Sequence, residues 1–174
     1  MTSILPLLPT LLGGLVLSPQ VTPRDEAQVT AAVVQYVLRP GQRFGQKAAA
    51  QRPLFIGLRE TEAAFAKASG RASRLDLASA LPIRFTPMAR TEATVCDKLP
   101  RTAVGCTIRD EGLWLAVHDV KWTGADDVQV TIEAAWAGPL IRGRPKTDAF
   151  LREVLLRRTP DGWRVVGEGR TFTA

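Results

Sequence analysis

The alternation of apolar and polar residues near the C-terminus constrains the fold of this chain more than any other feature. It is clearest over residues 128–136, which read VQVTIEAAW. Successive side chains of a strand point to opposite faces of a sheet, so this pattern gives one apolar face and one polar face. The apolar positions are Val128, Val130, Ile132, Ala134 and Trp136. The polar positions are Gln129, Thr131 and Glu133.

Three further segments have strand character, over residues 113–122, 149–158 and 162–173. Residues 123–127 (TGADD) and 159–162 (TPDG) have the composition of turns. We therefore expect four antiparallel strands in a meander, with a loop over residues 138–146 between the second and the third. Gly167 and Gly169 predict a bend or bulge in the last strand.

The N-terminal half has helical periodicity instead. A helix is predicted to begin near Arg24, since Asp25 and Glu26 suit the positive end of the helix dipole, and Pro40-Gly41 ends it. Its apolar face consists of Val29, Ala32, Val33, Tyr36 and Val37.

The segments between this helix and the meander are shorter. Residues 54–58 (LFIGL) fit a short strand or a buried connector, residues 60–68 a helix that ends before Gly70, and residues 74–81 one more helix. Residues 83–96 follow Pro82, contain Pro87 and are expected to be extended.

These elements predict one α+β domain over residues 24–174. N-terminal helices would pack on the apolar face of a curved antiparallel sheet of four or more strands. Because the sheet must cover this face, the first helix is the expected cover. The opposite face is expected to meet water.

The element order and the closing sequence GWRVVGEG (residues 162–169) resemble the nuclear-transport-factor-2-like superfamily. The resemblance covers about residues 25 to 173. It implies a cone-like fold in which a bent sheet wraps around helices and encloses a cavity. Enzymes of that superfamily often place an acid–base residue in the cone. The chain is also similar to short exported bacterial proteins with a cysteine pair before the meander.

Residues 1–23 form an apolar leader followed by a proline-bracketed linker. The run ILPLLPTLLGGLVL (residues 4–17) is short for a membrane span and suits the core of a secretory signal. No Lys or Arg precedes it and no Ala-x-Ala-like cleavage site follows it. Three alternatives stay open: a cleaved signal, a retained anchor, or an arm packed on the domain. We expect a secreted or periplasmic protein of the cell envelope.

The two cysteines favour export as well. Cys96 and Cys106 are separated by nine residues that include Pro100 and Gly105, so a hairpin can bring the sulfur atoms together. A disulfide there would stabilise the fold by roughly 3 kcal/mol. Two cysteines and one distant histidine do not make a four-ligand zinc site, and the spacing is not that of a redox CxxC pair. No metal or cofactor is expected.

His118 is the only histidine. In a regular strand it would share a face with Trp114 and Trp122, while Asp119 would lie on the other side. If that face is concave, Trp114, His118, Trp122 and Trp136 line a ligand pocket, and His118 is a weak catalytic candidate. The alternative is that His118 is an ordinary sheet residue and that the tryptophans fill the core.

Glu133 and Glu153 lie on neighbouring predicted strands, where they could meet each other or pair with Arg152, Arg157 or Arg164 on a solvated face. The formal net charge is +6, but the arginines are scattered, and the only local basic run is Arg142, Gly143, Arg144, Pro145 and Lys146. Neither a helix-turn-helix nor an aromatic stacking motif accompanies the charge, which disfavours nucleic-acid binding.

We therefore rank three functions. The first is a non-enzymatic accessory module of the cell envelope that binds a small apolar ligand or a protein partner, with a homodimer as one arrangement. The second is a cone-type isomerase or dehydratase that uses His118 with Glu133 or Glu153. The third is an anionic-surface binder that uses Arg142, Arg144 and Lys146. In all three, contact with a membrane would come only from an uncleaved leader.

Overall fold

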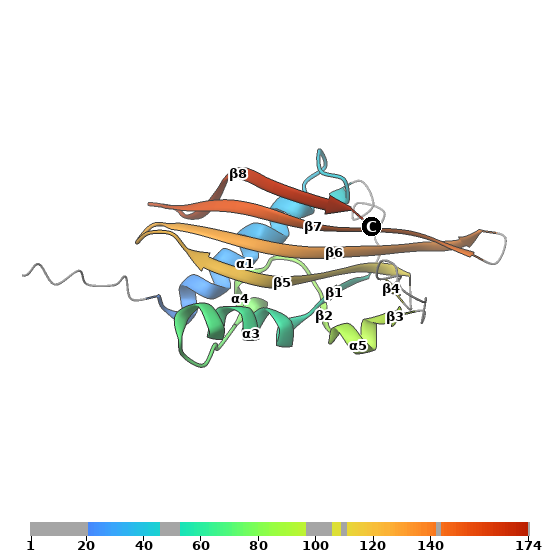
Figure 1. Cartoon of the computed structure of the whole chain (residues 1–174), viewed down its shortest axis with the longest axis horizontal. Coiled ribbons are helices and arrows are strands. Elements are labelled where there is room, and N and C mark those ends of the chain that lie inside the picture. The colour runs from blue at the N-terminus through green and yellow to red at the C-terminus, as the bar shows by residue number, and fades with distance from the viewer. Residues whose placement is uncertain (1–20, 46–52, 97–105, 109–110, 142–143, 174) are drawn as a thin grey trace, which may run out of the picture.

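The computed structural model describes residues 21–45, 53–96, 106–108, 111–141 and 144–173, and the side chains of these residues except 94–96, 106, 107 and 139–147. The leader, most of the linker and Arg142 lie outside these ranges. The longer helices lie on one side of a long twisted sheet (Figure 1). The predicted α+β class is confirmed.

The sheet has six strands in the order β2-β1-β5-β6-β7-β8. Its larger part is the predicted antiparallel meander of β5 (Gly112–Trp122), β6 (Asp127–Ile141), β7 (Arg144–Thr159) and β8 (Gly162–Thr173). Two short strands, β1 (Leu54–Ile56) and β2 (Thr86–Pro87), continue it beyond β5, and β1 runs parallel to both β5 and β2. The sheet does not close on itself.

The expected loop over residues 138–146 is largely strand. β6 continues to Ile141 and β7 begins at Arg144, with Leu140 opposite Pro145. This hairpin extends past the neighbouring strands at one end of the molecule (Figure 1). A register shift between Ala137 and Leu140 lets the pairing run on through Pro139. The predicted irregularity near Gly167 and Gly169 is confirmed by two register shifts between β7 and β8.

The first helix, α1 (Pro23–Val37), begins as predicted. Thr22 is its N-cap, and Asp25 completes a capping box by accepting the Thr22 backbone N–H at 3.0 Å. The second predicted helix is α3 (Leu58–Ser69), which ends at Gly70 with φ of 66°, a left-handed conformation that glycine adopts without strain. The third is shorter than expected, α4 (Leu77–Ala80).

Residues 83–96 are not simply extended. They contain β2, the one-turn helix α5 (Arg90–Ala93) and β3 (Thr94–Cys96). β3 pairs antiparallel with β4 (Cys106–Ile108) in a separate two-stranded sheet. The Pro82 and Pro87 breaks explain why no long strand forms here.

The main core lies between the helices and the sheet. Its buried residues include Val33 from α1, Phe65 from α3, Leu115 from β5 and Ile132 from β6. Ile132 and Trp136 belong to this same cluster, as the alternation of β6 predicts.

A second, smaller core lies on the opposite face of the sheet. It contains Phe55, Trp114, Ala116, Ala135 and Ala137 from the sheet, covered by Ala93 of α5 and Ile108 of β4. The expectation that this outer face meets water along its whole length was therefore wrong. At one end it is covered by α5 and the β3–β4 hairpin.

A β-bulge in β5 changes the faces that the sequence predicts. The register pairs Val117 with Ile132 and Asp119 with Thr131, so His118 is the extra residue. Trp114 consequently packs in the second core and Trp122 against the main core, not on one face. Thr131 alternates with core residues of β6, so its partner Asp119 faces the outer side, as does His118. The prediction that His118 and Asp119 lie on opposite faces of the sheet was wrong.

Candidate functional site

The outer face of the sheet brings His118 and Glu133 together. The Nε2 atom of His118 lies 2.5 Å from Oε2 of Glu133, a hydrogen bond between neighbouring strands β5 and β6. The side chain of His118 is 37% exposed and that of Glu133 17% exposed. A carboxylate that binds one imidazole nitrogen fixes the tautomer and leaves the other nitrogen to accept or donate a proton. The pair is thus chemically capable of acid–base work.

Glu133 is held from a second direction by Arg90. The guanidinium of Arg90 lies 3.2 Å from Oε1 of Glu133, so both carboxylate oxygens have partners. The backbone N–H of Arg90 donates to Oε1 of Glu60 at 2.7 Å. Oε2 of Glu60 is buried without a hydrogen bond within the described part of the chain. Sequence reasoning missed Arg90 because it lies on the short helix α5, far from Glu133 in the sequence, and only the tertiary fold brings the two together.

The predicted pocket of Trp114, His118, Trp122 and Trp136 does not form. Trp114 is fully buried in the second core, where its indole N–H donates to the Met88 carbonyl at 3.1 Å. Trp136 is buried in the main core on the other side of the sheet. Trp122 packs edge-on against Trp163, with ring centroids 5.7 Å apart, and also contacts Phe65. These three tryptophans are core residues.

Glu153 does not approach His118. Its carboxylate accepts hydrogen bonds from the backbone N–H of Arg170 at 3.1 Å and from the guanidinium of Arg170 at 3.2 Å. These two hydrogen bonds lower the pKa of the Glu153 carboxyl. An arginine does pair with Glu153, but it is Arg170 and not the predicted Arg152, Arg157 or Arg164.

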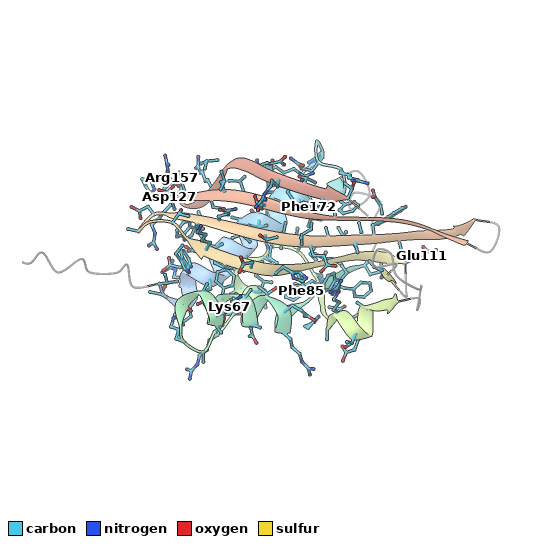
Figure 2. All side chains as sticks on the ribbon, viewed as in Figure 1. Lys67, Phe85, Glu111, Asp127, Arg157 and Phe172 are labelled. Carbon is cyan, nitrogen blue, oxygen red and sulfur yellow. The ribbon has the colours of Figure 1, made fainter. Side chains whose placement is uncertain are left out.

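Apolar side chains are exposed on the same outer face, over β7 and β8. Leu155, Val166 and Phe172 are 39%, 58% and 55% exposed, and half-buried Leu151 lies directly opposite Phe172. We call these four residues the outer apolar patch. Figure 2 shows Phe172 on this part of the sheet and the pair Asp127–Arg157 at its far end. Exposed apolar residues grouped in this way are typical of contact surfaces.

The helix side of the sheet carries a second polar cluster. The hydroxyl of Tyr36 donates to Oε1 of Glu168 at 2.6 Å, and Arg152 donates to the same oxygen at 2.6 Å and to Gln42 at 2.9 Å. Burial raises the pKa of Tyr36, and the hydrogen bond to Glu168 and its negative charge raise it further, against smaller opposing effects of Gln42 and Arg152. This cluster joins α1 to β7 and β8, and no sequence signal pointed to it.

Cys96 and Cys106 lie opposite each other in the register of β3 and β4. Directly opposed residues of an antiparallel pair have Cα atoms about 4.5–5.5 Å apart, a separation that a disulfide can span. The backbone is thus compatible with the predicted bond, which stays a prediction. Side chains of the basic run 142–146 lie outside the described residues.

No group of three or more His, Cys, Asp or Glu residues in the described part of the chain could hold a metal ion. Among the helices that the structure describes, none is long and apolar enough to cross a membrane. No protein-family model matches the sequence, and neither the curated proteins nor the solved structures contain a match.

Proposed function

We propose that this protein is a non-enzymatic accessory module of the cell envelope that binds a protein partner through the outer face of its sheet. The outer apolar patch carries this proposal. Leu155, Val166 and Phe172 place three large apolar side chains in water on one face, with the ion pair Glu153–Arg170 between Leu155 and Phe172. Protein interfaces combine large apolar side chains with charged ones in this way.

We also propose that the chain belongs to the nuclear-transport-factor-2-like superfamily and has its cone-like form. A long first helix, a short strand, further helices and then a four-stranded meander support this assignment. The bulges in β5 and β8 support it too, because bulges let a sheet curve. Export is supported by the leader-like residues 4–17 and by the opposition of Cys96 and Cys106.

Substitution in the outer apolar patch tests the binding proposal. Phe172→Ser and Val166→Ser should each weaken capture of an envelope protein by the purified chain, measured by cross-linking and mass spectrometry in envelope extract. Ile83→Ser is the matched control, since Ile83 is 40% exposed but lies outside the patch. Equal capture by all three variants would contradict the proposal. Loss of self-association alone, measured by sedimentation, would identify the partner as a second copy.

A second candidate function, an isomerase- or dehydratase-like enzyme, is favoured by the 2.5 Å contact of His118 with Glu133. Both reactions need a base that removes a proton next to a carbonyl group. NMR can follow exchange of such protons for deuterium in a panel of small carbonyl compounds. His118→Gln should abolish any exchange, whereas Asp119→Asn, an exposed neighbour, should not. Exchange that survives in His118→Gln would reject this function.

A further inference from the structure

A hollow of about 390 Å³ lies between the start of α1 and α4. It is on the helix side of the molecule, where α4 lies beside α1 (Figure 1). Its polar lining comes from Arg24 and Gln28 of α1 and from Arg74, Asp76 and Ser79 in and before α4. Sites for small ligands typically have volumes of about 300–1,000 Å³, so the hollow is large enough for one.

The two arginines of this hollow have no carboxylate partner among the described residues, a property that they share with Arg39, Arg59 and Arg84. Arg24 and Arg74 are exposed, and neither forms an ion pair with any residue that the structure describes. Eight other arginines do have a carboxylate partner: Arg43, Arg71, Arg90, Arg152, Arg157, Arg158, Arg164 and Arg170. Positive charge is therefore left uncompensated at the hollow.

The acidic groups around the hollow are already engaged. Asp76 caps α4 by accepting from the backbone N–H of Ser79 at 3.3 Å and from its hydroxyl at 2.6 Å. Asp25 accepts from Arg158, and Glu26 is buried against Arg71 and Ser73. The lining thus has two guanidinium groups against one carboxylate.

We propose that this hollow binds a phosphate group through Arg24 and Arg74. A guanidinium offers a planar fork of N–H donors that matches two oxygens of a phosphate, and two such groups match its double charge. Gln28 and the Ser79 hydroxyl add neutral hydrogen-bonding groups to the same lining. The site is separate from the outer apolar patch, so neither proposal depends on the other.

The phosphate could be soluble or part of a lipid headgroup. The apolar run ends at Leu17, seven positions before Arg24. Seven residues span at most about 25 Å, so a retained leader would hold the hollow close to a membrane surface. A cleaved leader would leave it to a soluble phosphate compound. The chemistry at the two arginines is the same in both cases.

Binding is tested with inorganic phosphate, and with phosphatidylglycerol vesicles against phosphatidylcholine vesicles. NMR amide shifts follow the soluble anion and flotation follows the vesicles, both with the purified full chain at low salt. Arg24→Gln and Arg74→Gln should each weaken binding by about fivefold or more. Arg59→Gln is the control, since Arg59 is exposed on α3 and does not line the hollow.

Saturable binding of inorganic phosphate that both variants weaken supports a soluble ligand. Binding to phosphatidylglycerol vesicles alone, with the same dependence on Arg24 and Arg74, supports a lipid headgroup. If Arg59→Gln weakens binding as much as the other two variants do, binding depends only on general positive charge, and the proposal is overturned. Absence of binding to both probes, or equally tight binding of acetate, overturns it as well. Circular dichroism confirms that each variant is folded.

Discussion

The Nε2 atom of His118 lies 2.5 Å from Oε2 of Glu133 because His118 is the extra residue of the bulge in β5. Without His118, the side chains of β5 would alternate regularly between the two faces of the sheet from Trp114 to Trp122. The bulge therefore places an imidazole on the outer face without displacing a core residue. It is a local insertion in an otherwise regular strand.

Deletion of His118 should consequently be tolerated. The remaining residues keep their register, with Val117 opposite Ile132 and Asp119 opposite Thr131, and every apolar side chain keeps its face. We expect a cost of at most about 2 kcal/mol in the free energy of unfolding, from lost curvature and the lost pair with Glu133. Urea unfolding followed by tryptophan fluorescence measures this cost.

Deletion of Thr131 is the matched control. It removes one residue from β6, which pairs with β7 without a register shift from Asp127 to Ala137, so side chains on one side of the deletion would change faces. This variant should lose its cooperative unfolding transition. Equal losses of unfolding free energy in the two deletion variants would contradict the assignment of His118 as the extra residue of the bulge.

The sequence predicted the meander well, because each of its strands is specified by local alternation and by a turn of suitable composition. The capping residues of α1 and the stop of α3 at Gly70 are also local signals. The bulge could not be predicted, since one extra residue in a strand leaves no signature when His118 and Asp119 are both polar. That single residue decided on which face Trp114 and Trp122 lie.

The candidate sites were predicted only in part. Glu133 was a predicted partner of His118, because the two residues come from neighbouring strands. Arg90 was not, and neither was the cluster of Tyr36, Arg152 and Glu168, because these contacts join segments far apart in the sequence. The cover on the second core was missed for the same reason. Ala93 and Ile108 carry no periodic pattern, and only the tertiary fold brings them over Trp114.

Gly57 should not accept a side chain. A Cβ atom there would lie 2.8 Å from Cζ2 of Trp114, from Cβ of Ala116 and from Oε2 of Glu60, distances that real Cβ atoms do not adopt. Gly57→Ala is expected to lower the free energy of unfolding by about 1–3 kcal/mol, since the Trp114 ring is fixed in its core. Gly41→Ala, where nothing lies within 4 Å, is the control and should change little. Equal effects in urea unfolding would contradict the packing described around Trp114.

The cover on the second core should depend on Cys96 and Cys106. If these residues form the predicted disulfide, the double substitution to serine should cost about 2–4 kcal/mol, because the unfolded chain gains freedom. A thiol count in denaturant without reductant measures the bond directly, and two free thiols in exported protein would contradict it. Reduced wild-type protein should then unfold at the same urea concentration as the serine variant.

Asp25 should make stability depend on pH. Burial raises the pKa of its carboxyl, but hydrogen bonds from Thr22 and Trp163 and the charge of Arg158 outweigh burial, so the pKa lies below its ordinary value of 3.8. A carboxyl whose pKa is lowered by folding binds protons more readily when unfolded. Its stabilisation is therefore complete above the ordinary value and is lost as pH falls through the lower, folded pKa.

Asp25→Asn should lower the free energy of unfolding by about 1–2 kcal/mol near neutral pH, because the half-exposed pair with Arg158 and the charged part of the capping box are lost. The deficit should shrink as pH falls below the ordinary value of 3.8 and the wild-type carboxyl becomes protonated. Asp161→Asn is the control, since the pair Asp161–Arg164 is mostly exposed and should contribute little. Urea unfolding at several pH values measures both variants, and a deficit of Asp25→Asn that grows on acidification would show that its charge destabilises the folded state.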